Sequence, residues 1–351
     1  MANEDKKKRL LAWLQTAVEL EIATIPPYMV ALLSMKRPAN REAADLIRGV
    51  MIEEMLHLAL VGNVFNAVGG TVRIGKDNIP SYPLRMKFEG KEFKDRKFSV
   101  NLARFSKENI EIFMKIEEPQ QPPPPRMAMA KEITIPGLTI GQFYNNIVRL
   151  LEELNAEDPE ALFSGDPSRQ LTDDYYWGAG GKIIPVSDLA SAKAALKIVI
   201  VQGEGAPIDR AAFRPGHPLE MGHYFRYSEI YYERHYTDTD DPGQPPTGEP
   251  LPVDYTAVYP IKENPTSADY AAGSPLAELN EAFNGHYTEM LQQIEQALTG
   301  TPKTLYTAIM NGMHSIDSAA MKMMATPIEG DAQGSTGCPT FEWAENAGDL
   351  L

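Results

Sequence analysis

The spacing of apolar residues divides the chain into helical segments separated by irregular ones. Between residues 5 and 35, apolar residues recur at intervals of three, four or seven, the pattern of one buried face of an α-helix. Residues 41–68 repeat this pattern and end at Gly69-Gly70, a typical signal for the C-terminus of a helix. The turn sequence "KRPAN" lies between the two segments, so we expect an antiparallel helical hairpin over residues 1–70.

The rest of the chain alternates between irregular and helical patterns. Residues 71–185 contain short alternating stretches that suggest a small hairpin, a proline-rich connector ("EEPQQPPPPRMAMA") and one helical stretch ("IGQFYNNIVRLLEELN"). Helical periodicity returns in a second hairpin over 186–236 and in a C-terminal hairpin over 276–326, with a long loop at 237–275 between them. We predict one mostly α-helical domain over 1–351: a helical bundle with an irregular insertion and an additional C-terminal hairpin.

Composition and charge narrow the classes of function. Of the 351 residues, 43% are hydrophobic and 23% are charged, and 33 Lys and Arg against 48 Asp and Glu give a net charge of −15. This balance argues against a nucleic-acid or anionic-membrane partner, because both bind basic patches. The apolar run at the N-terminus is too short for a signal peptide, and no window approaches the apolar length that spans a bilayer. We expect a cytoplasmic protein, and the single Cys338 cannot form a thiolate cluster within one chain.

Acidic residues interrupt the apolar faces of the first hairpin. Glu21 continues the apolar stripe of the first helix, and Glu54 and His57 lie three residues apart on the stripe of the second. In an antiparallel hairpin, residues equidistant from the turn lie level, and the mean of positions 21 and 54 falls inside "KRPAN". Two facing, buried carboxylates repel and are costly to desolvate. Because no Lys or Arg lies nearby on these stripes, the pattern predicts a compensating metal ion.

The second hairpin repeats the pattern less regularly. Glu220 and His223 have the same three-residue spacing as Glu54 and His57, and the mean of positions 204 and 220 falls in the connector "IDRAAFRPG". Glu204 lies near the end of the preceding helix, where a carboxylate opposes the helix macrodipole. Local energetics disfavour a carboxylate there, so we interpret Glu204 as a further candidate ligand.

Together these residues predict a two-metal centre. One Glu and one Glu-x-x-His from each hairpin is the ligand set of the di-iron and di-manganese carboxylate bundles. Carboxylate oxygens with only two imidazoles suit iron or manganese better than copper(I) or a structural zinc. We expect two iron ions, with manganese as the alternative. The predicted metal ligands are Glu21, Glu54, His57, Glu204, Glu220 and His223.

A set of longer stretches between residues 20 and 343 carries a resemblance to a known family. The stretches are "LEIATIPPYMVAL", "MIEEMLHLALVGNVFNAVGG", "LFSGDPSRQ", "IVIVQGEGAP", "HYFRYSEI" and "FNGHYTEML" through "TGCPTFEW". In these stretches the chain resembles the ferritin-like domain of iminophenyl-pyruvate dimer synthases, the group of chromopyrrolic acid synthase and its violacein-pathway relative. One departure is Ile22, where the resemblance leads us to expect a histidine. The resemblance implies a ferritin-like bundle that performs oxidative chemistry on an amino-acid-derived substrate, usually in secondary metabolism.

We therefore expect a metal-dependent oxidoreductase that binds a small-molecule substrate and O₂, either as a single chain or as a homo-oligomer. Tyr28 lies two turns from Glu21 on the same helix face, and Arg226 and Tyr227 follow His223. We select Tyr28, Arg226 and Tyr227 as candidate catalytic residues, with Arg226 placed to pair with a substrate carboxylate. Two alternatives stay open: a non-catalytic iron-binding protein, and a helical scaffold without metal.

Overall fold

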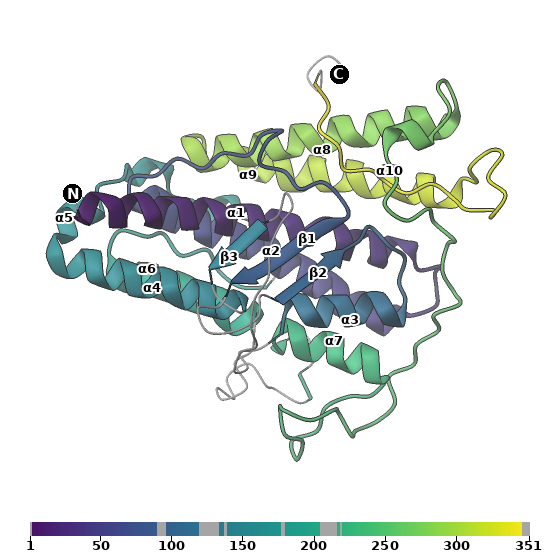
Figure 1. Ribbon diagram of the computed structural model, residues 1–351, viewed down its shortest axis with the longest axis horizontal. Helices are drawn as coiled ribbons and strands as arrows, with labels where there is room; N and C mark the ends of the chain where they lie inside the picture. The colour runs from purple at the N-terminus through teal and green to yellow at the C-terminus, as the bar shows by residue number, and fades with distance from the viewer. Residues whose placement is uncertain are drawn as a thin grey trace.

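Two central helices lie between two outer helical layers (Figure 1). The computed structural model describes residues 2–89, 96–118, 133–136, 139–176, 180–203, 216–217 and 220–345. The buried apolar side chains of the three layers form one large core cluster that includes residues of both central helices.

The central layer is the predicted hairpin, formed by α1 (Ala2–Ser34) and α2 (Arg41–Ala67). Helix α2 ends as its sequence predicts: Gly69 adopts a positive φ of 79°, and the N–H of Gly70 donates to the carbonyl of Phe65 at 2.9 Å. A residue with a side chain is rarely found in this left-handed conformation, which explains glycine at position 69.

Helix α1 corrects one expectation. It contains a window that is long and apolar enough to cross a membrane, whereas the sequence analysis found no window that approached this length. However, 78% of that window is buried inside the protein. Its apolar character is therefore explained by packing on both sides within the bundle.

One outer layer carries two helix pairs that pack against the central hairpin (Figure 1). The pairs are α3 (Lys107–Ile116) with α7 (His223–Tyr232), and α4 (Ile140–Glu157) with α6 (Leu189–Gly203). Helix α6 begins after Asp188, whose Oδ1 accepts from the N–H of Ser191 at 2.8 Å, a side-chain cap. The predicted second hairpin thus contains α6 and α7, but α7 starts only at His223.

The other outer layer is the predicted C-terminal hairpin. Helix α8 (Pro275–Thr299) packs against a second rod, which consists of α9 (Thr304–Thr307), the π-helical turn η6 (Ala308–Gly312) and α10 (Met313–Ala325). Both α8 and α10 also contact the central hairpin, on the side opposite α3, α4, α6 and α7 (Figure 1).

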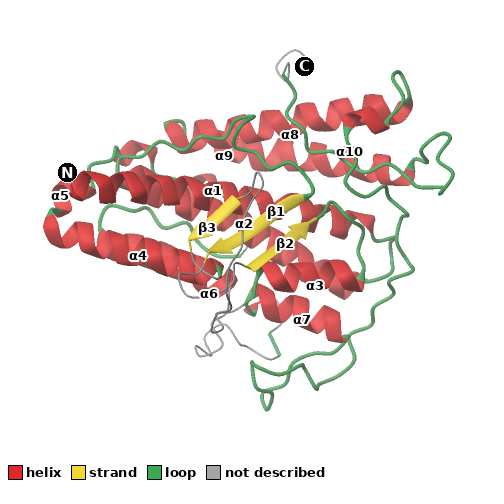
Figure 2. Cartoon of the chain, viewed as in Figure 1, coloured by secondary structure: helices red, strands yellow, loops and turns green. Residues whose placement is uncertain are grey.

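The insertion is more ordered than its sequence suggests. A small sheet, drawn in yellow in Figure 2, has the strand order β2-β1-β3. Strands β1 (Leu84–Glu89) and β2 (Arg96–Val100) form the predicted antiparallel hairpin, and β3 (Ile133–Pro136) pairs parallel to β1. Shorter elements are α5 (Pro159–Leu162), η1 (Pro167–Arg169), η2 (Asp173–Tyr175) and η5 (Ser267–Asp269). Helix α3 was not predicted, and its C-terminal end reaches the site described next.

Candidate metal centre

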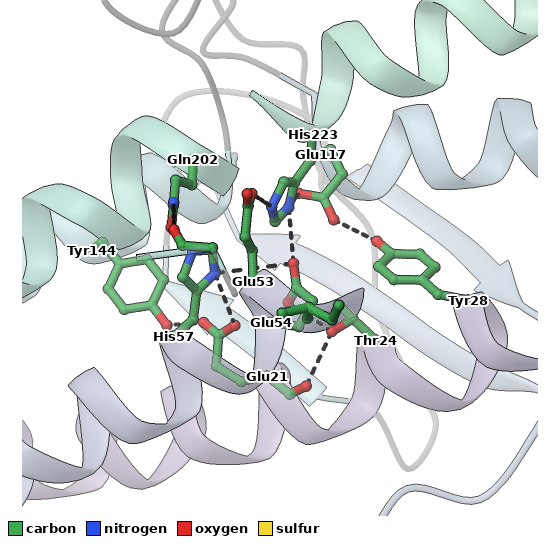
Figure 3. Close-up of polar contacts among 12 residues, drawn as sticks. Glu21, Thr24, Tyr28, Glu53, Glu54, His57, Glu117, Tyr144, Gln202 and His223 are labelled. Carbon is green, nitrogen blue, oxygen red and sulfur yellow. Dashed lines mark hydrogen bonds and ion pairs between the residues drawn. The ribbon is translucent and has the colours of Figure 1, made fainter. Parts of the chain in front are cut away.

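Three carboxylates and two imidazoles meet in the core between the central hairpin and the layer of α3, α6 and α7 (Figure 3). All five are at most 4% exposed. They form two groups, Glu21 with Glu54 and His57, and Glu54 with Glu117 and His223. Within each group the candidate donor atoms lie within 4.8 Å of one another, and Glu54 belongs to both. The arrangement is therefore that of two adjoining sites with one common carboxylate.

Each carboxylate has one oxygen held by a hydroxyl group and the other directed at a histidine. The hydroxyl donors come from α1 and α4, and Figure 3 shows the two tyrosines on opposite sides of the cluster. Their hydrogen bonds run from Tyr144 to Glu21 Oε1, from Thr24 to Glu54 Oε2 at 2.8 Å, and from Tyr28 to Glu117 Oε1. Because one oxygen of each carboxylate is already engaged, a single oxygen of each is left to face the imidazoles.

The orientation of Gln202 determines which nitrogen of His57 carries the proton. The Gln202 side-chain N–H donates to the carbonyl of Gly180 at 2.5 Å, so its Oε1 faces His57 Nε2 at 3.0 Å. Since Oε1 can only accept, Nε2 must be the protonated nitrogen. The lone pair of His57 Nδ1 is then free, 3.6 Å from Glu21 Oε2 and 4.0 Å from Glu54 Oε1.

His223 is oriented in the same way by a carboxylate. Its Nε2 lies 3.0 Å from Glu53 Oε2, and Glu53 also accepts two hydrogen bonds from Arg226 Nη2, at 2.8 and 2.9 Å. Its Nδ1 lies 2.9 Å from Glu54 Oε1 and 3.4 Å from Glu117 Oε2, without making a well-formed hydrogen bond. An imidazole lone pair that faces two carboxylates requires either a second proton or a metal cation between them.

Gly180 allows the chain to approach the centre closely. It adopts a φ of +93°, and a Cβ at this position would lie 2.6 Å from Cγ of Glu53. Only glycine therefore fits here without displacing Glu53. Gly180 thus brings its carbonyl to Gln202, and through it orients His57.

Burial shifts the ionisation of the cluster. It raises the pKa of Glu21 to about 7, and it also raises the pKa of Glu54 and of Glu117, in both cases with help from a neighbouring carboxylate. The pKa of His57 is lowered by burial. Arg226 does not compensate the three carboxylates, since its charge is paired with Glu53. A divalent cation would supply the missing positive charge.

The residues present fit two metal ions. Five atoms face one another: Glu21 Oε2, Glu54 Oε1, Glu117 Oε2 and the Nδ1 atoms of His57 and His223. With Glu54 shared, each ion would have three of these protein donors, which leaves coordination positions for solvent or substrate. Hard oxygen donors with imidazole suit iron or manganese. The acceptors Glu53 and Gln202 are the outer partners that usually fix a metal-binding histidine.

The structure brings together four of the six predicted ligands: Glu21, Glu54, His57 and His223. Glu204 lies outside the described residues. Glu220 is not brought into the cluster, because α7 begins at His223 and Glu220 is an exposed residue that precedes the helix. Without a helix that includes both residues, the three-residue spacing does not place them on one face.

The residue that sequence reasoning missed is Glu117. It directly follows the last residue of α3, is 2% exposed, and was read as the first residue of the proline-rich connector. The signal that identifies it is periodicity: Ile110, Phe113 and Glu117 follow the three- and four-residue spacing of one helix face, and all are buried.

The three candidate catalytic residues make different contacts in the structure. Tyr28 contacts the centre by donating to Glu117. Arg226 binds Glu53 through Nη2 and the carbonyl of Met221 through Nε at 2.6 Å, while its Nη1 has no partner among the described residues, so its pairing with a substrate carboxylate stays a prediction. Tyr227 is fully buried against Tyr28, and among the described residues its hydroxyl has no well-formed hydrogen bond.

The metal-free protein should lose stability as the pH rises from about 4.5 to about 7, and His223 should extend this loss to higher pH. Burial raises the pKa of Glu21 from 4.5 to about 7. Burial alone would lower the pKa of His223, but Glu117 and Glu53 raise it well above 6.5. The folded chain thus holds protons that the unfolded chain has released, and a higher pH favours unfolding. The lowered pKa of His57 opposes this trend only below about pH 6.5, where the unfolded imidazole binds a proton that the folded one does not.

Urea denaturation of chelator-treated protein at several pH values measures this effect. Adding Mn²⁺ should abolish it, because the ion replaces the retained protons. A metal-free protein that becomes more stable between the two limits would contradict the proposed electrostatics of the cluster.

Comparison with known proteins agrees with this architecture. A sequence model described as ferritin-like matches residues 14–232. A crystal structure of a ferritin like protein from Caulobacter vibrioides has a similar fold, with a TM-score of 0.59 and 18% sequence identity over 95% of this chain and 97% of that chain. At this level of identity the likeness concerns the fold alone. No curated protein matches the sequence.

Proposed function

This chain belongs to the ferritin-like family, and we propose that it is a metal-dependent oxidoreductase that binds two iron ions among Glu21, Glu54, His57, Glu117 and His223. One observation carries the proposal. Both histidines have one nitrogen bound to an outer acceptor, so their free nitrogens face three buried carboxylate oxygens. Without a cation, that arrangement of acceptors is costly.

The donor count supports reaction with O₂ rather than a structural role for the metal. Structural sites generally fill every coordination position with protein ligands, whereas catalytic sites leave one open. Iron bound here would supply electrons for the reduction of O₂. The protein positions the ligands: Tyr28 and Tyr144 each engage one carboxylate oxygen, while Glu53 and Gln202 orient the imidazoles. Buried aromatic rings, among them Phe113, exclude bulk water.

The proposed substrate is a small molecule derived from an amino acid, and the proposed context is secondary metabolism. This part rests on the resemblance to the ferritin-like domain of imino acid dimer synthases. The stretches "LEIATIPPYMVAL" and "MIEEMLHLALVGNVFNAVGG", which carry that resemblance, also contain Glu21, Glu54 and His57. An aromatic imino acid is therefore the first substrate to test.

Metal titration followed by oxygen uptake tests the proposal. Chelator-treated protein should take up two Fe²⁺ ions per chain under anaerobic conditions. At a free metal concentration of one hundred times the Kd, each bound ion should raise the free energy of unfolding by about 2.7 kcal/mol. The loaded protein should then consume O₂ when aromatic amino or imino acids are supplied.

The alternatives predict other results. A non-catalytic iron-binding protein would take up iron without consuming these compounds, and a metal-free scaffold would take up none. The matched control is Glu111→Gln, which removes an exposed carboxylate of α3 that is paired with Lys115 and should leave uptake unchanged.

A further inference from the structure

An apolar cavity of about 60 Å³ lies on the opposite face of the central hairpin from the metal centre. It is enclosed between α1 and α2 on one side and α8, η6 and α10 on the other, two layers that Figure 1 shows in contact. The residues that line it are aliphatic, methionine, proline or tyrosine; among the described residues, no charged or amide side chain contributes to its wall.

The size and chemistry of the cavity restrict its occupant. A water molecule needs two to four polar partners, so an apolar cavity generally stays dry and instead binds apolar molecules. A known apolar cavity of about 150 Å³ accommodates benzene or xenon. A volume of about 60 Å³ is too small for an aromatic amino acid, but it suits a diatomic gas or a single xenon atom.

The same two helices form the wall of the cavity and carry the ligands of the centre. On α1, Ile22 and Ile25 line the cavity; Ile22 directly follows Glu21, and Ile25 directly follows Thr24, which donates to Glu54. On α2, Met55 and Leu58 also line the cavity, and they directly follow Glu54 and His57 in the sequence. Only the thickness of these two helices therefore separates the cavity from the centre. The position of Ile22 also explains its identity, since a histidine there would place an imidazole in an apolar wall.

The wall has features that permit a small molecule to pass. Five of the lining residues are methionines, whose unbranched side chains change conformation readily. Ala308 and Ile309 line the cavity from the π-helical turn η6, and such turns within helices often occur at functional sites. Tyr176 lines the cavity at another point, and its hydroxyl lies 3.5 Å from the carbonyl of Ile52, which directly precedes Glu53 and Glu54 in α2.

We propose that this cavity is a binding site for molecular oxygen that holds O₂ beside the metal centre. The inference rests on the proposed function and extends it, since the cavity would hold O₂, the oxidant of that reaction, in a separate, dry site. Binding is reversible and involves no change in the bonds of O₂, because the cavity offers only apolar contacts.

Xenon, an apolar atom of similar size, is the probe. Crystals of the full chain, with and without Mn²⁺, should show one xenon position bounded by Ile25, Met55 and Ile309 after pressurisation. Ala308→Leu should fill the cavity and remove this xenon position. The same variant should retain metal binding and should slow the oxidation of Fe²⁺-loaded protein by O₂ several-fold.

Ala59→Val, which adds less volume, gives a second test if Ala308→Leu does not fold. Ala44→Leu on α2 lies outside the cavity and serves as the control. Absence of xenon from the cavity in the unchanged protein would overturn the proposal, as would an unchanged oxidation rate in a folded, xenon-free variant. Because xenon binding does not need metal, a failed metal titration would leave the xenon result interpretable.

Discussion

Replacing Glu54 with glutamine should abolish the binding of both metal ions. Glu54 Oε1 faces His57 Nδ1 at 4.0 Å and His223 Nδ1 at 2.9 Å, and it is the donor atom common to both groups. A neutral amide oxygen cannot replace this charge. We expect the affinity for Fe²⁺ or Mn²⁺ to fall by more than the roughly 100-fold that loss of an outer partner can cost. Isothermal titration and elemental analysis of the purified variant measure the loss.

Two further variants should each weaken the binding of one metal ion more than the other. Glu21→Gln should weaken mainly the ion on the side of His57, and Glu117→Gln the ion on the side of His223, because each carboxylate belongs to only one group. The metal-free Glu54→Gln protein should be more stable than the unchanged protein, since one of three mutually repelling carboxylates is gone. Retention of two tightly bound ions after Glu54→Gln would show that Glu54 is not shared.

Replacing Glu53 with leucine should cause the largest loss of stability. Arg226 is 1% exposed, and Glu53 accepts two hydrogen bonds from its Nη2. Removing one partner leaves a buried guanidinium without its counter-charge, which typically costs about 3–5 kcal/mol of unfolding free energy. His223 would also lose the acceptor of its Nε2, so metal affinity should fall about 10- to 100-fold. Urea denaturation and metal titration measure the two effects.

The double variant Glu53→Leu with Arg226→Met separates the ion pair from the rest of the site. It should recover most of the stability, because no unpaired charge is left, but it should not recover metal affinity. The exposed pair of Lys193 and Glu152, which joins α6 to α4, is the control, and breaking it should cost at most about 1 kcal/mol. A loss below about 1 kcal/mol for Glu53→Leu would mean that water reaches Arg226.

Three of the five residues of the centre could be predicted from the sequence because they depend on local regularity. In α1 and α2, helical periodicity places Glu21, Glu54 and His57 on buried faces, and the short turn between the helices puts positions 21 and 54 at one level. The structure brings these residues together as expected. Their positions depend only on helix geometry and a tight turn, and both are predictable from residues close together in the sequence.

The other two residues are less predictable because the connections are long: His223 is predicted only through its spacing from Glu220, and Glu117 is not predicted. The argument from residues equidistant from a turn requires a short turn, whereas residues 204–222 separate α6 from α7. His223 is the first residue of α7, and it lies in the centre without Glu220. Glu117 arrives instead from α3, which packs beside α7. Its position depends on the contact between two helices that are more than one hundred residues apart, which no local pattern records.

The sequence by itself determined that the chain is mainly helical, that its first two helices pair, and that acidic groups and a histidine interrupt their apolar faces. These properties follow from the period of a helix and from the free energy of burying apolar surface. Only the tertiary structure decided which other side chains complete the cluster, which hydroxyl groups hold its carboxylates, and which nitrogen of each imidazole is free. Those features arise where distant segments meet, and there hydrogen bonding and charge compensation in the interior select the contacts.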